Sequence, residues 1–139
     1  MNRVKITLPE TIIFTTTFKV TVQQINYGNH LGNDAVLTIA HQARIDWLTS
    51  LQLNEKDLGD QTGVIMADCM VSYKNEGFLN DQLTINLYIG DTSKVAFDLY
   101  YEIVNQDQKV IALVKTGMIC FDYQTRKVNP IPNSFQEMW

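Results

Sequence analysis

Apolar residues recur at helical spacing in one long segment of the chain, between residues 33 and 51. They stand at steps of four, three, four and four residues, at Val36, Ala40, Ala43, Trp47 and Leu51. This period places them on one face of an α-helix and predicts that the face is buried. Asn33 is a suitable N-cap for this helix, and Asp34 is a favourable acidic residue for its first turn. We therefore expect a helix that begins near Asn33 and packs on a large apolar surface.

Strand-like sequence surrounds the helix. Apolar and polar residues alternate clearly in residues 83–89 and 95–103, which predicts strands with one buried face. The predicted strands cover residues 64–75, 82–90, 94–105 and 109–123, and an earlier strand lies within residues 11–22. Short polar connectors, NEGFLND, GDTS and NQDQ, favour antiparallel pairing of consecutive strands. The expected fold is α+β, with one helix against a five-stranded antiparallel sheet.

The strands also indicate how the chain associates and how it ends. Around residues 65–71 and 110–121, apolar side chains fall on both faces, and one helix cannot cover two faces and the edges. We expect sheets of two subunits to associate, in a homodimer or homotetramer. In the tail NPIPNSFQEMW, prolines flank Ile131, so the tail is expected to leave the sheet as an extended arm.

Composition narrows the class of protein. The chain has 139 residues, of which 45% are hydrophobic, so a single domain over residues 1–139 with its own core is expected. A net charge of −4 argues against a nucleic-acid partner, because phosphate binding needs clustered Lys and Arg. No segment reaches the roughly 18 apolar residues of a membrane span, and the N-terminus lacks a leader pattern. We expect a cytoplasmic protein with no membrane partner.

The cysteines and histidines exclude several chemistries. Cys69 and Cys120 lie far apart in strand-like sequence without metal-ligand spacing, and both are interpreted as reduced core thiols. The only histidines are His30 and His41, which is too few for a His-rich metal site, so neither a metal nor a cofactor is expected. His41, on the helix flank, is interpreted as hydrogen-bonded or solvated. A G-x-S-x-G nucleophile motif is absent.

The start of the helix is the predicted active site. The first backbone N–H groups of a helix lack partners within it, and the helix dipole adds partial positive charge there. Such an end can hold an oxyanion. Gly28 and Gly32 precede it and permit positive φ angles or the close approach of a ligand to the backbone.

Two segments carry a family resemblance that extends over nearly the whole chain. NYGNHLGNDAVLTIAHQARIDWL resembles the segment D-x-x-G-H-V-N-N-x-x-Y-x-x-x-x-E-x-A-R of hotdog-fold thioesterases, specifically the 4-hydroxybenzoyl-CoA thioesterase-like group. VSYKNEGFLNDQLTI is similar to the strand–turn–strand segment Y-x-x-P-x-x-x-G-D-x-L of that group. Counting back from Arg44, Asn33 falls on the second Asn of the family segment and His30 on its His. Asn26 stands where many members have a catalytic acid, which is a departure from the pattern.

The resemblance implies a hotdog fold, in which a sheet wraps one long central helix, and an acyl-CoA thioesterase activity. It implies a dimer or a dimer of dimers with each site formed between two subunits. The backbone N–H that polarises the thioester carbonyl transfers to Asn33, and a carboxylate activates water. Because Asn26 cannot act as that acid, the nearest replacement is Asp34.

For several of these residues, a purely structural role is an alternative to the functional one. Asp34 could simply complement the helix dipole. His30 could orient water or substrate or be an ordinary turn residue, and Asn26 could position water through its amide or belong to a turn. The predicted substrate-binding residues are Gly32, Asp68, Tyr73 and Lys74. Of these, Asp68 interrupts an apolar strand and needs a partner, solvent or a pocket.

Two other functions stay open. The first is a non-catalytic acyl- or CoA-binding hotdog module, in which the loss of the acid at Asn26 leaves a pocket without chemistry. The second is a hotdog dehydratase, which would pair His30 with Asp34. The sequence does not reveal the acyl group, or whether CoA or an acyl carrier protein bears it.

Overall fold

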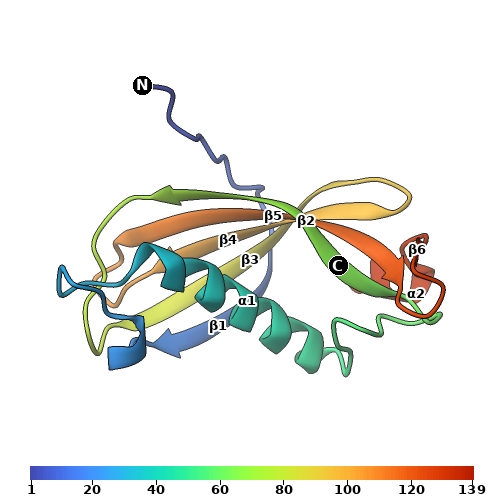
Figure 1. Ribbon diagram of the computed structural model, residues 1–139, viewed down its shortest axis with the longest axis horizontal. Coiled ribbons are helices and arrows are strands. Elements are labelled where there is room, and N and C mark those ends of the chain that lie inside the picture. The colour runs from blue at the N-terminus through green and yellow to red at the C-terminus, as the bar shows by residue number, and fades with distance from the viewer.

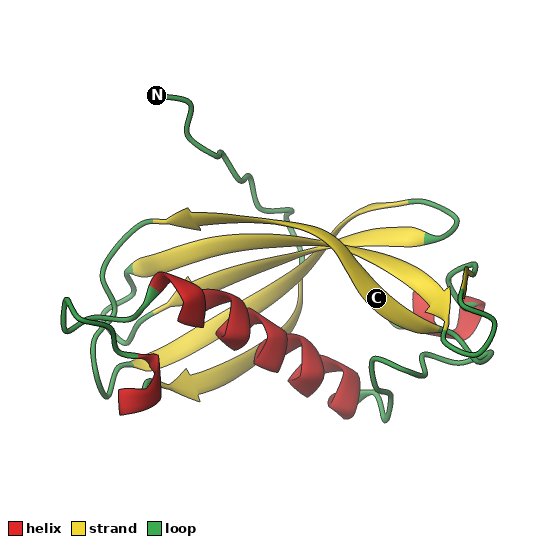
Figure 2. Cartoon of the chain, viewed as in Figure 1, coloured by secondary structure: helices red, strands yellow, loops and turns green.

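A curved antiparallel sheet with one long helix across a single face makes up the computed structural model, which describes residues 1–139 (Figures 1 and 2). The strands are β1 (Ile12–Lys19), β2 (Gly63–Tyr73), β3 (Gln82–Thr92), β4 (Ala96–Val104), β5 (Val110–Asp122) and β6 (Lys127–Val128). The helices are η1 (Val22–Gln24), a 3-10 turn, the long α1 (Asn33–Ser50) and the short α2 (Asn133–Gln136). The predicted α+β architecture is confirmed, with the short β6 as an addition.

The strand order is β1-β3-β4-β5-β2, with β6 paired to β5. Consecutive pairing is therefore correct for β3, β4 and β5 but wrong for β2, which pairs with β5 from Gly63 opposite Phe121 to Tyr73 opposite Ala112. The segment NEGFLND, expected to close a hairpin, instead crosses from β2 at one edge to β3 beside β1. The physical reason is that β5, with buried residues along most of its length, needs a hydrogen-bonded neighbour on both sides, and β2 supplies the second.

Helix α1 packs its predicted apolar face on the sheet. Its buried apolar residues are Val36, Ile39, Ala40, Ala43, Trp47 and Leu48. They belong to a core of 24 residues that includes the inward-facing side chains of β3, β4 and β5. Leu51 is only partly buried, because the helix ends at Ser50. The helical period in the sequence therefore identifies the buried face correctly. None of the helices has the length and apolar composition needed to cross a membrane.

A chain of polar side chains also joins the helix to the sheet. Arg44, which is buried, donates to the Tyr101 hydroxyl at 2.9 Å, and that oxygen lies 2.8 Å from Thr116 Oγ1. Arg44 Nε also donates to Glu55 Oε2 at 2.9 Å, and His41 Nε2 lies 2.6 Å from Glu55 Oε1. These bonds satisfy the polar atoms of Arg44 and Tyr101, which would otherwise oppose burial. His41 is thus hydrogen-bonded, as expected.

The C-terminal tail does not form the expected extended arm. Ile131 and Phe135 are buried, and residues 133–136 form α2. The Phe135 ring lies 4.7 Å from that of Trp139 and 5.5 Å from that of Trp47, with Phe97 in contact at 5.7 Å. Between the prolines, the Ile131 N–H still donates to Lys94 O at 2.9 Å, so the tail stays beside the sheet. The apolar residues between and after them then fold back to cover the end of α1, because exposing several aromatic side chains to water is unfavourable.

The two cysteines differ, contrary to the prediction that both are core thiols. Cys120 is fully buried, and burial raises the pKa of its thiol to about 11. Cys69 is exposed on β2. The difference follows from strand order, since β2 lies at an edge and β5 lies inside the sheet.

Truncation of Phe135 tests the role of the tail. Phe135→Ala should lower the free energy of unfolding by about 3–5 kcal/mol, because it removes a fully buried ring and leaves a cavity. Met138→Ala, a change at an exposed neighbour, should alter it by less than about 0.5 kcal/mol. Urea denaturation followed by fluorescence measures both. Equal, small effects of the two changes would show that the tail contributes no packing.

The hydrogen bonds from α1 to Glu55 should make the stability of the fold depend on pH. Burial opposes ionisation of Glu55, but hydrogen bonds from His41 and Arg44 outweigh it and lower the pKa of this carboxyl below its ordinary value of 4.5. The carboxylate therefore stabilises the fold above that value, and the contribution is lost as pH falls through the lower folded-state pKa.

Glu55→Gln should accordingly destabilise the protein at pH 7 by on the order of 1 kcal/mol. The difference from the unmodified protein should shrink as pH falls below 4.5. Thermal melts between pH 3 and pH 7 measure this, with Glu137→Gln, at an exposed residue of the tail, as the control. A stability difference that stays constant over this range would contradict the assignment.

Candidate functional site

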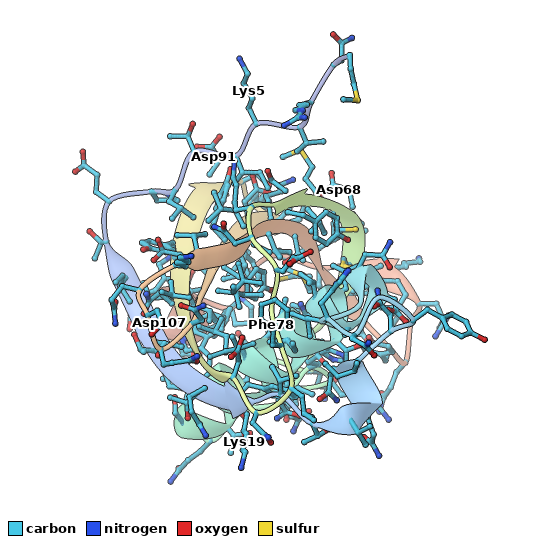
Figure 3. The ribbon with its side chains drawn as sticks, turned by 90° about the vertical axis from the view of Figure 1, so that its left-hand side faces the viewer. Lys5, Lys19, Asp68, Phe78, Asp91 and Asp107 are labelled. Atoms are coloured by element: carbon cyan, nitrogen blue, oxygen red, sulfur yellow. The ribbon has the colours of Figure 1, made fainter.

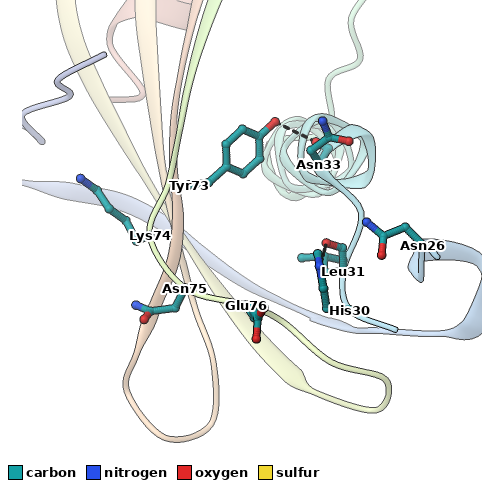
Figure 4. A pocket seen from close by; sticks show the side chains of 8 residues that line it. All are labelled: Asn26, His30, Leu31, Asn33, Tyr73, Lys74, Asn75 and Glu76. Atoms are coloured by element: carbon teal, nitrogen blue, oxygen red, sulfur yellow. Dashed lines mark hydrogen bonds between the residues drawn. The ribbon is translucent and has the colours of Figure 1, made fainter. Parts of the chain in front are cut away.

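A cavity of about 510 Å³ lies at the start of α1, beside the end of β2 (Figure 4). Its lining comes from two segments, the loop before the helix and the chain that leaves β2. The lining residues are Asn26, His30, Leu31, Asn33, Tyr73, Lys74, Asn75 and Glu76. The structure thus brings together five of the eight predicted site residues, from positions that are far apart in the sequence.

A backbone hydrogen bond joins the two segments, from the Leu31 N–H to the Gly77 carbonyl at 2.7 Å. A second bond, from the Gly32 N–H to Gln24 O at 2.8 Å, closes the loop before the helix. Within the loop, Asn26 Oδ1 accepts from the Gly28 N–H at 2.9 Å, which is an Asx turn. The amide of Asn26 is therefore used in part by the turn, and its other atoms stay available at the cavity wall.

The start of α1 differs in detail from the prediction. The N-cap is Gly32, with φ −68° and ψ 146°, and Asn33 is the first helical residue. The prediction that Asn33 caps the helix is therefore wrong by one residue, because the bend of the chain falls at Gly32. No side chain caps the helix. The N–H groups of Asn33 and Asp34 have no acceptor within the protein, which leaves the positive end of the helix available at the cavity.

Close approach, and not positive φ, explains the two glycines of this loop. A Cβ on Gly32 would lie 2.6 Å from Asp34 Oδ1, and one on Gly28 would lie 2.8 Å from His30 Nε2. Both side chains therefore rest against the backbone of a glycine. His30 Nδ1 lies 3.1 Å from the Leu31 carbonyl. These contacts restrict the orientation of the His30 ring at the cavity wall.

Asp34 lies to one side of the cavity. Its carboxylate folds back over Gly32, where it complements the helix dipole. It lines a neighbouring hollow of about 540 Å³ together with Asn26, Tyr27 and Asn29. Asn26 borders both hollows, so Asp34 and the cavity are separated by this residue and the first turn of the helix.

Tyr73, the last residue of β2, links the sheet to the start of α1 at the cavity. Its hydroxyl donates to the backbone carbonyl of Asn33 at 3.0 Å (Figure 4). Partial burial, followed by the nearby charges of Asp34 and Cys69, raises the pKa of Tyr73 above its ordinary value of 10. The phenol is therefore a neutral hydrogen-bond donor at pH 7. Lys74, the next residue, projects from the opposite side of the strand (Figure 4).

Leu31, Asn75 and Glu76 line the cavity but were not predicted from the sequence, and Glu76 is the ionisable one among them. Its carboxylate is exposed and lines the same cavity as Asn33 and Tyr73. The signal in the sequence was indirect. In the segment similar to Y-x-x-P-x-x-x-G-D-x-L, Glu76 occupies the position of the proline. An acid therefore replaces a family residue in the segment after β2, while Asn26 replaces a family acid in the loop before the helix.

Asp68 lies outside the cavity lining. It accepts from Lys115 Nζ at 2.8 Å and from the Gly117 N–H at 3.1 Å, and the bond from Lys115 lowers the pKa of this carboxyl. Lys115 also lies 3.3 Å from Asp98. An ion pair thus satisfies the acid that interrupts β2. No group of three or more His, Cys, Asp or Glu side chains is placed to hold a metal ion.

The fold and this cavity define a class of protein. The model of the thioesterase-like superfamily matches residues 20–138, and the chain belongs to that family. The match confirms the resemblance drawn from the two sequence segments and the class of enzyme, a thioester hydrolase. A comparison with curated protein sequences finds no match.

Solved structures share the fold at low sequence identity. A 1,4-dihydroxy-2-naphthoyl-CoA thioesterase from Synechocystis superimposes with a TM-score of 0.81 at 23% identity, over 90% of this chain and 93% of that one. A hypothetical protein from Staphylococcus aureus, solved in complex with CoA, gives 0.82 at 20% identity, over 97% and 85%. A gentisyl-coenzyme A thioesterase gives 0.79 at 19% identity, over 90% and 98%. These likenesses confirm the hotdog fold.

Proposed function

We propose that the protein hydrolyses an acyl-CoA thioester at the cavity where α1 begins. The observation that carries the proposal is the N–H group of Asn33, which has no acceptor within the protein and belongs to a residue that lines the cavity together with Glu76. A thioester carbonyl placed there would accept a hydrogen bond from the Asn33 N–H. Such a donor could lower the barrier by about 3–4 kcal/mol, because negative charge develops on this oxygen during attack.

The reaction then proceeds by attack of water. Water adds to the carbonyl carbon, its proton passes to a carboxylate, and the oxyanion forms at the start of the helix. Collapse of this intermediate breaks the carbon–sulfur bond, and the thiolate receives the proton from the carboxyl group. The products are a carboxylic acid and free CoA. A general base can contribute about 10²–10⁴-fold to such a step.

Two carboxylates are the candidates for this base, that of Asp34 in the first turn of the helix and that of Glu76 in the cavity lining. Asp34 is the acid predicted from the sequence, but it lies against Gly32 in the neighbouring hollow. We favour Glu76, because it lines the cavity with Asn33 and Tyr73. Asn26 and His30, at the opposite wall, would orient water or the substrate carbonyl. Tyr73 and Gly32 would shape the entrance.

A second copy of the chain would complete this site. Strand β2 is an unpaired edge, and it exposes Ile65 by 36%, Met66 by 48%, Met70 by 37% and Tyr73 by 55%. The other edge, β1, is shorter and exposes fewer large apolar residues. Pairing of two β2 edges would bury this surface. Since β2 ends at Tyr73, the partner would also adjoin the cavity and shield Glu76 from water. A homodimer or homotetramer follows from this proposal.

A matched pair of variants tests the chemistry. Glu76→Gln should lower kcat/KM for a reactive acyl-CoA roughly 10²-fold or more, because the amide cannot accept the water proton. Asp34→Asn, which keeps the size and the polarity of the first turn, should have a much smaller effect. Release of free thiol measures the rate, and the melting temperature checks the fold. Loss of activity only in Asp34→Asn would instead identify the acid predicted from the sequence.

The same assay decides between turnover and binding. Saturable binding of acyl-CoAs without thiol release, across short, long and aromatic acyl groups, would favour the non-catalytic binding module. The absence of an acid at Asn26 is the observation that keeps this second function in view.

A charge on the β2 edge tests the assembly. The unmodified protein should have at least twice the mass of one chain by light scattering at micromolar concentration. Met66→Lys should shift it toward the monomer, because a desolvated lysine opposes edge pairing. Thr17→Lys, on the exposed side of β1, should leave the mass unchanged. A monomeric unmodified protein would contradict the proposed assembly.

A further inference from the structure

Three cationic residues line a further hollow, of about 610 Å³, beside the end of β2. Its lining consists of Arg3, Val4 and Lys5 from the N-terminal arm and Val71, Ser72, Tyr73 and Lys74 from the strand and its continuation. No acidic residue lines it. The arm, residues 1–10 before β1, reaches this position by passing behind the sheet, on the side away from α1 (Figure 1).

The charge of this hollow is unusual for the chain. The protein has a net charge of −4, yet Arg3, Lys5 and Lys74 form no ion pair with any of its acids. A single exposed lysine requires no explanation. Three cations brought together from two distant segments, without a counter-charge, form a local positive potential that attracts an anion.

The exposure of the arm residues differs between apolar and charged side chains. Ile6, Leu8 and Pro9 are partly buried, whereas Arg3 and Lys5 are exposed. The apolar residues therefore attach the arm to the body of the protein and leave the charged ones accessible. Figure 3 shows Lys5 projecting from the arm at one end of the molecule, with Lys19 at the other.

The hollow adjoins the candidate active site around the end of the edge strand. Tyr73 and Lys74 line both of them. Tyr73 points to the start of α1, and Lys74 points to the other side of the strand (Figure 4). An elongated ligand with a reactive group at one end and negative charges at the other could therefore occupy both at once.

We propose that this cationic hollow binds the phosphate groups of the CoA nucleotide, so that the N-terminal arm acts as a phosphate clamp. The inference rests on the proposed acyl-CoA function. Arg3 suits this role because its planar guanidinium can bind two phosphate oxygens at once, while Lys5 and Lys74 add point charges. The thioester would then extend past Tyr73 to the N–H groups at the helix start.

Binding measurements with a charge-matched control test the clamp. The double variant Arg3→Glu, Lys5→Glu is compared with Lys19→Glu, Lys127→Glu, which changes the net charge equally at exposed positions away from the hollow. Calorimetry at low salt measures the affinity of the full chain for CoA, for adenosine 3′,5′-bisphosphate and for pantetheine, which lacks phosphate.

The arm variant should bind CoA and the bisphosphate about tenfold more weakly or worse, which corresponds to the loss of one charge-assisted hydrogen bond. Its affinity for pantetheine should not change, and the control should stay within about twofold for all three ligands. The loss should diminish at high salt, because the cations are exposed. Equal losses in both double variants would show only a general effect of net charge and would overturn the clamp, as would an unchanged affinity in the arm variant.

The outcome can be separated from that of the proposed activity. If no acyl-CoA is hydrolysed but bisphosphate binding depends on the arm, the clamp stands and the proposed turnover fails. If hydrolysis occurs and the arm variant keeps the KM for acyl-CoA, the turnover stands and the clamp fails. A weaker interaction with a phosphopantetheine-bearing acyl carrier protein, without any change in CoA affinity, would also overturn the assignment to the CoA nucleotide.

Discussion

The packing of α1 across the concave face of the sheet is the interaction on which the rest of the structure depends. Two kinds of contact fix it. The apolar face of the helix fills the core, and Arg44 bonds Tyr101 in the middle of β4. Apolar packing alone tolerates small rotations and shifts, whereas a buried guanidinium with two defined partners specifies the position of the helix. The first turn of α1 is consequently held at the end of β2.

Two features produce the candidate site, namely this position of α1 and the absence of a capping side chain at its start. Gly32 provides no capping side chain, so the N–H groups of Asn33 and Asp34 are left without acceptors. Unpaired donors are unfavourable in isolation. Here the first of them belongs to Asn33, which lines a cavity to which β2 contributes Tyr73 and the segment after it contributes Glu76. A feature that weakens the helix end is the same one that suits the proposed polarisation of a carbonyl.

The end of β2 links three proposed properties of the molecule. Its edge carries the exposed apolar surface for a second copy, its last residue bonds the helix start, and its continuation meets the N-terminal arm. Assembly, the candidate site and the phosphate clamp therefore share residues within a few positions of Tyr73. A change in this short segment is therefore expected to affect more than one of them.

The sequence alone predicted the main helix and strands and the location of the candidate site. Helical and alternating periods reflect which side chains avoid water, so they identified α1 and the five main strands, and the glycine-rich loop before Asn33 marked the helix start. These are local properties. The resemblance of two segments added the family and the residues Asn26, His30, Tyr73 and Lys74 at the cavity.

Only the tertiary structure decided which elements are neighbours. The strand order put β2 at an edge, which exposed Cys69 and left Cys120 buried. The tail folds back because its aromatic residues find the end of α1, a contact that proline signals cannot reveal. Glu76 and the group of Arg3, Lys5 and Lys74 lie in segments with no distinctive local pattern. Their significance depends on distances across the fold, and a sequence pattern records spacing along the chain but not proximity in space.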